Sequence, residues 1–141
     1  MARLKQMSLA KKMFLPAGVQ IPCVNLPFDA ELDDVMPWAS DIGTASSMVK
    51  DGKVPAFLLF VENSKQLEGY AAELEELWGH RINFWIFYPK KPHLNTDLSR
   101  DVTWKLMKKH GMSGTRQVAI SDLWSCMYFK NTGNEVMPDK A

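Results

Sequence analysis

The sequence has almost no excess of charge of either sign. It holds 17 lysine and arginine residues against 16 aspartate and glutamate residues, which leaves a formal net charge of +1. A chain this balanced has no overall electrostatic attraction to nucleic acid or to an anionic membrane surface, so any such binding must come from a local patch. No apolar run approaches the length of a membrane span. We therefore expect neither a nucleic acid nor a membrane as the partner.

Cysteine is also scarce. Cys23 and Cys126 lie far apart, each within an apolar segment, with no C-x-x-C spacing and no histidine close in sequence. This pattern is typical of buried free thiols in a reducing compartment. The N-terminal region is basic but holds only broken apolar runs, too short for the core of a signal peptide. We therefore expect a cytoplasmic protein.

Several motifs of catalysis and of metal binding are missing. There is no G-x-x-x-x-G-K-[ST] motif of a P-loop nucleotide site and no G-x-S-x-G motif of a serine hydrolase. His80, His93 and His110 are scattered over separate loops or helix ends, so no set of metal ligands can be identified. We therefore expect no metal and no cofactor.

Two continuous apolar segments predict the centre of a parallel sheet. Residues 54–61 and 82–88 have the uninterrupted apolar character of strands that are covered on both faces. Between them, Asn63 and Gln66 predict a capped helix that ends near Gly79. A strand, a helix and a strand in this order favour a right-handed crossover of two parallel strands. The expected fold class is a three-layer α/β domain with a mainly parallel sheet.

Shorter patterns complete the expected domain, which spans residues 1–130 as a single unit. Pro22 cannot donate a ladder hydrogen bond, so its strand should be an edge strand or irregular. The last two strands should close the sheet as an antiparallel pair, and residues 131–141 are expected to form a flexible tail. The remaining segments are expected to be a short helix over 8–14, strands over 19–26 and 38–44, helical turns over 29–36, a helix from Thr96 or Asp97 to about His110, and closing strands over 117–120 and 126–129.

The polar loop that follows the second central strand is the first candidate site. In parallel sheets, ligands usually bind beyond the carboxyl ends of the strands. If Thr96 or Asp97 begins the next helix, the free N–H groups of its first turn can bind a phosphate or a carboxylate. The alternative is that Asp97 fills this place as the cap, and that Arg100 pairs with Asp101 or another acid. The basic side chains close to this turn in sequence are Lys90, Lys91, His93 and Arg100.

Two tryptophans extend the candidate site. Trp104 falls on the polar face of the predicted helix. We expect that its ring is covered by another element of the chain, that Arg100 and Lys108 cover it through cation–π contacts, or that it contacts a partner. Trp124 and Ser125 lie in the expected turn between the last strands, at the same end of the sheet. The predicted binding residues are therefore Lys90, Lys91, Asp97, Arg100, Asp101, Trp104, Trp124 and Ser125.

Several segments, taken in order, resemble a known family. They are Ala10-Lys11-Lys12 before a Pro-x-Gly turn, the run Phe57 to Val61, Tyr88-Pro89-Lys90 leading to Thr96 to Asp101, and Asp122 to Ser125 followed by Phe129. Over most of residues 8–130 the chain resembles a bacterial family of short proteins known only as a domain of unknown function. The members of that family look like trimmed relatives of the class I methyltransferases. The resemblance implies a Rossmann-like, methyltransferase-like sheet closed by an antiparallel hairpin, and it implies no established activity.

The residues themselves argue against methyl transfer. A site for S-adenosylmethionine needs a glycine-rich turn after the first strand, where the backbone approaches the cofactor closely. Here Leu26 is followed by Pro27 and Phe28, which we expect to fill that space. We therefore predict a non-catalytic module that binds a small anionic ligand or a protein partner. A small methyltransferase-like enzyme with an atypical cofactor site is the alternative, and a homodimer through Trp104 or the edge near Pro22 is a third.

Overall fold

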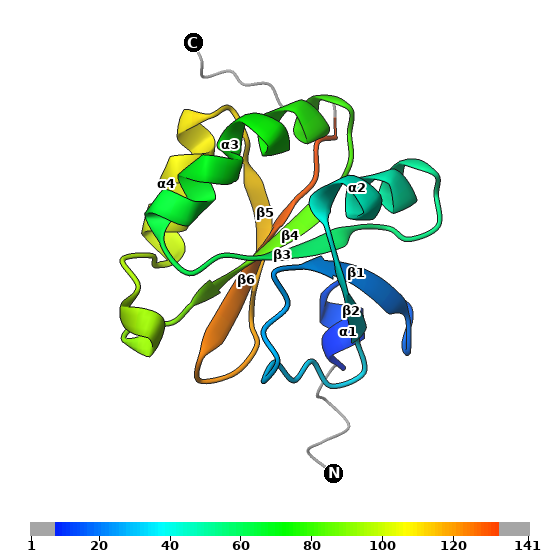
Figure 1. Cartoon of the computed structure of the whole chain (residues 1–141), viewed down its shortest axis with the longest axis horizontal. Helices are drawn as coiled ribbons and strands as arrows, with labels where there is room; N and C mark the ends of the chain where they lie inside the picture. The colour runs from blue at the N-terminus through cyan, green and yellow to red at the C-terminus, as the bar shows by residue number, and fades with distance from the viewer. Residues whose placement is uncertain (1–7, 133–141) are drawn as a thin grey trace.

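A six-stranded mixed sheet organises the chain in the computed structural model, which describes residues 8–132 (Figure 1). Its strands are β1 (Gln20–Val24), β2 (Met36–Ser40), β3 (Phe57–Phe60), β4 (Phe84–Pro89), β5 (Gly114–Ala119) and β6 (Trp124–Phe129), in the order β2-β1-β3-β4-β6-β5. The four neighbouring strands β2, β1, β3 and β4 are parallel, and β6 is antiparallel to both of its neighbours, β4 and β5. The predicted α/β class, the mostly parallel sheet and the antiparallel C-terminal pair are confirmed.

The two apolar segments form the centre of the sheet, as predicted. Every residue of β3 and of β4 is buried. Strand β3 is shorter than the predicted apolar run, since only residues 57–60 of 54–61 belong to it. Phe60 of β3 stacks on Phe87 of β4, with the ring centroids 4.4 Å apart. Aromatic contact of this kind joins the two central strands in addition to their ladder hydrogen bonds.

Three helices cover one face of this sheet: α2 (Ile42–Lys50), α3 (Ser64–Gly79) and α4 (Arg100–Lys109) (Figure 1). The helix predicted over 63–79 is confirmed with its cap, since Asn63 Oδ1 accepts from the backbone N–H of Gln66 at 2.8 Å. Gln66 reaches back to the N–H of Glu62 at 2.7 Å, one residue before the expected position of a capping box. The inner face of α3 buries Leu67, Ala71 and Leu74 against the sheet.

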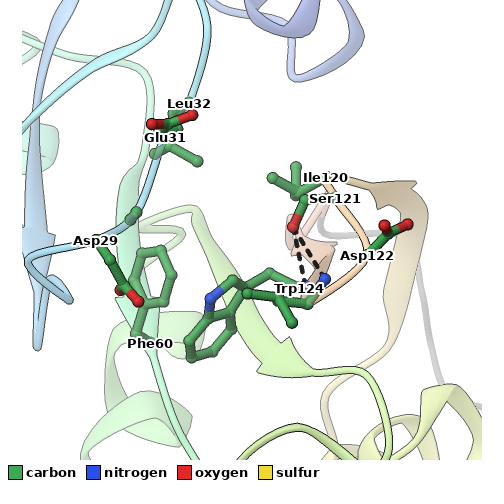
Figure 2. A pocket seen from close by; sticks show the side chains of 10 residues that line it. Asp29, Glu31, Leu32, Phe60, Ile120, Ser121, Asp122 and Trp124 are labelled. Carbon is green, nitrogen blue, oxygen red and sulfur yellow. Dashed lines mark hydrogen bonds between the residues drawn. The ribbon is translucent and has the colours of Figure 1, made fainter.

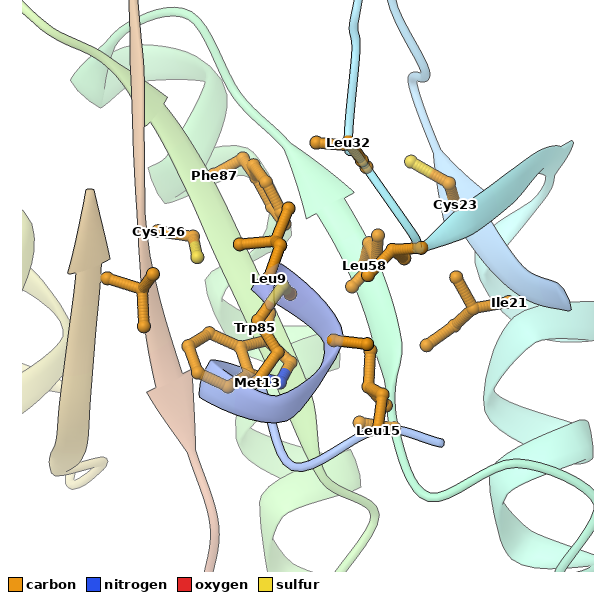
Figure 3. Packing of buried hydrophobic residues seen from close by; sticks show 14 of the residues in the cluster. Leu9, Met13, Leu15, Ile21, Cys23, Leu32, Leu58, Trp85, Phe87 and Cys126 are labelled. Atoms are coloured by element: carbon orange, nitrogen blue, oxygen red, sulfur yellow. The ribbon is translucent and has the colours of Figure 1, made fainter. Parts of the chain in front are cut away.

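The opposite face carries little regular structure. Its cover is the single-turn helix α1 (Leu9–Lys12) together with the irregular segment 25–35 (Figure 3). Asp34 joins the two, because its Oδ1 accepts from the backbone N–H of Ala10 at 2.9 Å. Leu9 and Met13 then close over the indole of Trp85 in the sheet. The expected third layer is therefore a short helix and a loop rather than a row of helices.

The first strand is not an edge strand, so the edge alternative of the prediction is wrong. β1 lies inside the sheet between β2 and β3. Pro22 pairs with Trp38 of β2, and the ladder with β3 begins only at Cys23, so the missing N–H of Pro22 falls outside that ladder. The exposed edge next to Pro22, which was considered for a homodimer, is formed by β2 and not by β1.

The segment between β1 and β3 also differs from the prediction. Residues 29–36 form no helical turns, and the strand expected over 38–44 begins at Met36 and stops at Ser40. Asp41 then caps α2, with Oδ1 accepting from the N–H of Thr44 at 2.7 Å. A side-chain acceptor at this position satisfies a free donor of the first turn, which favours a helix over a longer strand.

The ends of the later elements are shifted from the expected positions. α4 starts at Arg100 and its cap is Ser99, whose Oγ accepts from the N–H of Val102 at 3.1 Å, so neither Thr96 nor Asp97 begins this helix. Of the expected flexible tail over 131–141, residues 133–141 lie outside the described part of the chain. Asn131 is held, because its Nδ2 donates to the carbonyl of Trp78 at 2.8 Å. Within residues 8–132, none of the helices could cross a membrane.

Candidate functional site

Loops from distant parts of the sequence meet at one edge of the sheet, the edge that is formed by the carboxyl ends of its parallel strands. Segment 25–35 follows β1, residues 61–63 follow β3, and residues 90–99 follow β4. Trp124, the first residue of β6, pairs with Pro89, the last residue of β4, so the turn 120–123 lies at the same edge. The carboxyl ends of parallel strands are the usual place for ligands in such sheets. The sheet divides this edge into two pockets, one on the face of α4 and one on the face of α1.

The pocket on the face of α4 has a volume of about 250 Å³ and is called here the basic pocket. Three of its side chains are cationic, and none of its lining residues carries a carboxylate. Its cationic members come from the loop after β4 and from the first turn of α4. The lining residues are Tyr88, Pro89, Lys90, Lys91, Leu98, Ser99, Arg100, Gln117 and Ser125.

Buried polar groups form one wall of the basic pocket. The Tyr88 side chain is almost fully buried, and its hydroxyl accepts from Gln117 Nε2 at 2.7 Å. Ser125, also buried, lines the pocket from the neighbouring strand. Burial raises the pKa of Tyr88 to about 12, although hydrogen bonds from the side chains of Ser125 and Gln117 act in the opposite direction. The phenol is therefore neutral at physiological pH.

The charged groups of the basic pocket differ in how they are held. Lys90 Nζ donates to the carbonyl of Ser121 at 2.9 Å, which fixes this ammonium group on the β5–β6 turn. Arg100 and Lys91 make no hydrogen bond and no ion pair with any residue of the described chain. The predicted alternative in which Arg100 pairs with Asp101 is therefore wrong. The guanidinium group remains available to an anion from outside the chain.

A smaller hollow of about 220 Å³ continues the basic pocket along α4 and β5. The two share Arg100 and Gln117 as lining residues. Trp104 lines this second hollow with 41% of its surface exposed, and Lys108 Nζ lies 5.4 Å from the centre of its ring. The predicted cation–π contact is present for Lys108 but not for Arg100, and the ring remains partly exposed.

Asp97 and Asp101 are not part of the basic pocket, contrary to the prediction. Both carboxylate oxygens of Asp97 bind Ser64, one at the backbone N–H at 2.8 Å and one at the hydroxyl. These bonds lower the pKa of Asp97, with the Ser64 hydroxyl as the largest cause. Asp97 therefore binds the first residue of α3, whose cap is Asn63, and it does not cap α4. Asp101 is an exposed residue of the first turn of α4 and lines neither pocket.

Trp124 and Ser125 do not line one site together, because they begin strand β6 instead of lying in the turn. Side chains alternate between the two faces of a strand, so neighbours in sequence point to opposite sides. Ser125 reaches the basic pocket, whereas Trp124 lines the pocket on the face of α1. His93 packs edge-on against the ring of Trp124, with the ring centroids 5.4 Å apart, and it does not line the basic pocket.

Comparison of the chain with protein families, with curated proteins and with solved structures gives no match. What the pockets can bind is therefore argued from their own residues. Within residues 8–132, no group of three histidine, cysteine or acidic side chains is placed to hold a metal ion. Cys23 and Cys126 are buried free thiols, as predicted, and burial raises the pKa of both. Neither thiol can act as an exposed nucleophile.

Five lining residues of the basic pocket were missed by the sequence prediction: Tyr88, Pro89, Leu98, Ser99 and Gln117. Tyr88 and Gln117 are the two of these that belong to its polar wall. Tyr88 closes an apolar segment and Gln117 opens the next predicted strand, so both looked like ordinary strand residues. A polar side chain at the carboxyl end of a buried strand is the signal that could have identified Tyr88. No signal in the sequence places Gln117 beside it, since β5 reaches Tyr88 only across the inserted strand β6.

Proposed function

We propose that the chain is a non-catalytic binding module that takes a small anionic ligand in the basic pocket. The ligand is a compound with a phosphate or carboxylate group, which lies beside Arg100 and Lys91. The observation that carries this proposal is the composition of the pocket, which offers two cationic side chains that make no hydrogen bond and no ion pair within the described chain, and no carboxylate. An anion is the simplest partner for such a surface.

The neutral groups of the pocket support recognition of an oxygen-rich ligand. Tyr88, Ser125 and Gln117 form a connected polar wall that is largely buried at Tyr88 and Ser125. Hydrogen bonds from preorganised side chains orient a ligand that the charges attract. The volume of about 250 Å³ lies at the small end of ligand pockets, so a metabolite of modest size fits better than a dinucleotide.

The absence of catalysis is proposed from the groups that line the pocket. Nucleophilic catalysis needs a nucleophile beside a base, and no histidine, cysteine or acid lines the basic pocket. The hydroxyl of Ser125 has only the neutral phenol of Tyr88 beside it. The two buried free thiols also favour a reducing cytoplasm as the place of action.

A methyltransferase-like ancestry of the sheet fits this proposal. The antiparallel strand β6 lies between β4 and β5, and the turn after β1 contains no glycine. The expectation that Phe28 fills the space of the cofactor is wrong, because Phe28 is 92% exposed and fills no pocket. A small methyltransferase-like enzyme with an atypical site therefore stays as the second candidate, and S-adenosylmethionine belongs in the ligand screen.

A thermal-shift screen of the purified chain tests the proposal. The panel holds inorganic phosphate, nucleotides, small phosphorylated and carboxylated metabolites, S-adenosylmethionine and S-adenosylhomocysteine. A ligand at about one hundred times its dissociation constant stabilises the fold by roughly 2.7 kcal/mol, which is a shift of several degrees for a domain of this size. Arg100→Ala should abolish the shift.

Lys105→Ala is the matched control, because Lys105 is an exposed lysine of the same helix that lines neither hollow. It should leave the shift unchanged. The proposal is wrong if no anion of the panel stabilises the chain, or if a stabilising anion acts equally on Arg100→Ala and on the wild type. A shift with S-adenosylmethionine alone would favour the second candidate.

A further inference from the structure

The pocket on the face of α1 has a different chemistry from the basic pocket. It has a volume of about 300 Å³ and is called here the acidic pocket (Figure 2). Segment 29–32 forms one side and the turn between β5 and β6 forms the other, with Phe60 between them. It lies on the other side of the sheet from Arg100, so its ligand is separate from the anion proposed above.

Three carboxylates surround the acidic pocket: Asp29, Glu31 and Asp122. None of them accepts a hydrogen bond or forms an ion pair with a residue of the described chain. They are not clustered closely enough to hold one metal ion together. Lys90 is bound to the carbonyl of Ser121 and does not line the pocket. Carboxylates that are too far apart to coordinate one metal ion can still attract an organic cation through their negative charge.

The inner wall of the acidic pocket supplies a hydrogen-bond donor. Trp124 is only 6% exposed, and its ring is fixed by an edge contact with Phe60 at 4.9 Å and by His93. Its indole nitrogen points across the pocket toward Asp29 and has no hydrogen-bond acceptor within the described chain (Figure 2). This N–H is not one of the buried atoms without a partner and is open to the pocket, so a ligand oxygen can replace the water that it would otherwise bind.

We propose that the acidic pocket binds a small organic ammonium compound that also carries a hydroxyl or carbonyl oxygen. The oxygen accepts the hydrogen bond of the Trp124 indole, and the negative charge of the three rim residues, Asp29, Glu31 and Asp122, attracts the ammonium group. The aromatic rings of Trp124 and Phe60 give this end of the pocket an apolar wall for the methyl or methylene groups of the ligand.

Two sources share this chemistry, a free amino alcohol and the lysine side chain of another protein. Choline serves as the probe for the first, and Nα-acetyl-lysine methylamide serves as the probe for the second. Because the pocket lies at the small end of ligand sites, tighter binding of choline is expected. Tighter binding of the lysine derivative would keep the ammonium site and assign it to a protein partner.

Calorimetric titration of the chain with choline tests the proposal, with two analogues that each lack one group. The neutral carbon isostere of choline keeps the hydroxyl without the charge, and propyltrimethylammonium keeps the charge without the hydroxyl. Each analogue should bind about tenfold more weakly than choline. In Trp124→Phe, which keeps an aromatic ring without the N–H, choline should lose its advantage over propyltrimethylammonium.

Variants of the rim separate binding from folding. Asp29→Asn and Asp122→Asn each remove one exposed charge that makes no internal bond, so they should fold normally and bind choline several-fold more weakly. Asp33→Asn is the matched control, because Asp33 is an exposed acid of the same segment outside the pocket. The proposal is overturned if neither probe binds at millimolar concentration, if the neutral isostere binds as well as choline, or if the rim variants match the control.

Discussion

The carboxylate of Asp97 binds the first residue of a helix that begins 33 residues before it, at Ser64. One oxygen accepts from the Ser64 N–H at 2.8 Å, and the other accepts from the Ser64 hydroxyl. The loop after β4 is thereby attached to the first turn of α3, next to the residues that line the basic pocket. The contact explains why a residue that was predicted to bind a ligand belongs to the framework of the site.

Asp97→Ala should lower the free energy of unfolding by about 1 kcal/mol, because it removes the acceptor of a free N–H in the first turn of α3 and leaves the cap, Asn63, in place. The measurement is urea denaturation followed by circular dichroism. Asp101→Ala is the control, because Asp101 is an equally exposed aspartate of the same region without a bond to the described chain. Equal stability of the two variants would show that the Asp97–Ser64 contact contributes nothing measurable.

Acid should weaken the fold partly through Asp97. Its folded pKa lies below the ordinary value of 3.8, because the Ser64 hydroxyl and N–H bind the ionised carboxylate. Above the unfolded pKa both states are ionised, and the full contribution of the contact is present. As the pH falls, the unfolded chain takes up the proton first, so stability is lost until the folded carboxyl is protonated as well.

The test is the urea midpoint measured between about pH 5 and pH 2 for the wild type and for Asp97→Asn. The amide has nearly the same shape and does not titrate, so the variant should lose less stability than the wild type over this range. Glu68, whose pKa is lowered by Lys109 and His110, contributes in the same direction in both proteins and cancels in the comparison. Parallel curves would contradict the assignment to Asp97.

The centre of the fold could be predicted from the sequence because its signals are local. Uninterrupted apolar runs mark β3 and β4, and the pair Asn63 and Gln66 marks the start of α3. The helix α2 was missed because its inner face is formed mainly by Ala45 with Ile42 and Val49, too little apolar surface to stand out in a segment rich in serine. Its cap, Asp41 with Thr44, was the available signal.

The candidate site was predicted only in part, for a reason that concerns strand geometry. Lys90, Lys91 and Arg100 come from one continuous loop and helix start, so their closeness follows from the sequence. The prediction assigned Trp124 and Ser125 to a turn and so placed both side chains in one site. Both residues belong to strand β6, where neighbouring side chains point to opposite faces of the sheet. The division of the edge into a basic and an acidic pocket follows from this alternation and from the sheet order.

Thr103 presents a last test, inside α4. Its side chain is fully buried on the face that packs on the sheet, and its hydroxyl has no hydrogen-bond partner in the described chain. An unpaired buried hydroxyl costs about 1–3 kcal/mol. Valine has the same shape and a similar helix propensity, so Thr103→Val removes this cost without opening a cavity.

We expect Thr103→Val to raise the free energy of unfolding by about 1 kcal/mol and the melting temperature by several degrees. Thr103→Ser is the matched control, because it keeps the hydroxyl and removes only the methyl group, and it should lower stability. Differential scanning calorimetry of the three proteins measures both effects. If valine is the less stable variant, the hydroxyl has a partner in solution, and the inner face of α4 beside the basic pocket holds a polar contact rather than a purely apolar one.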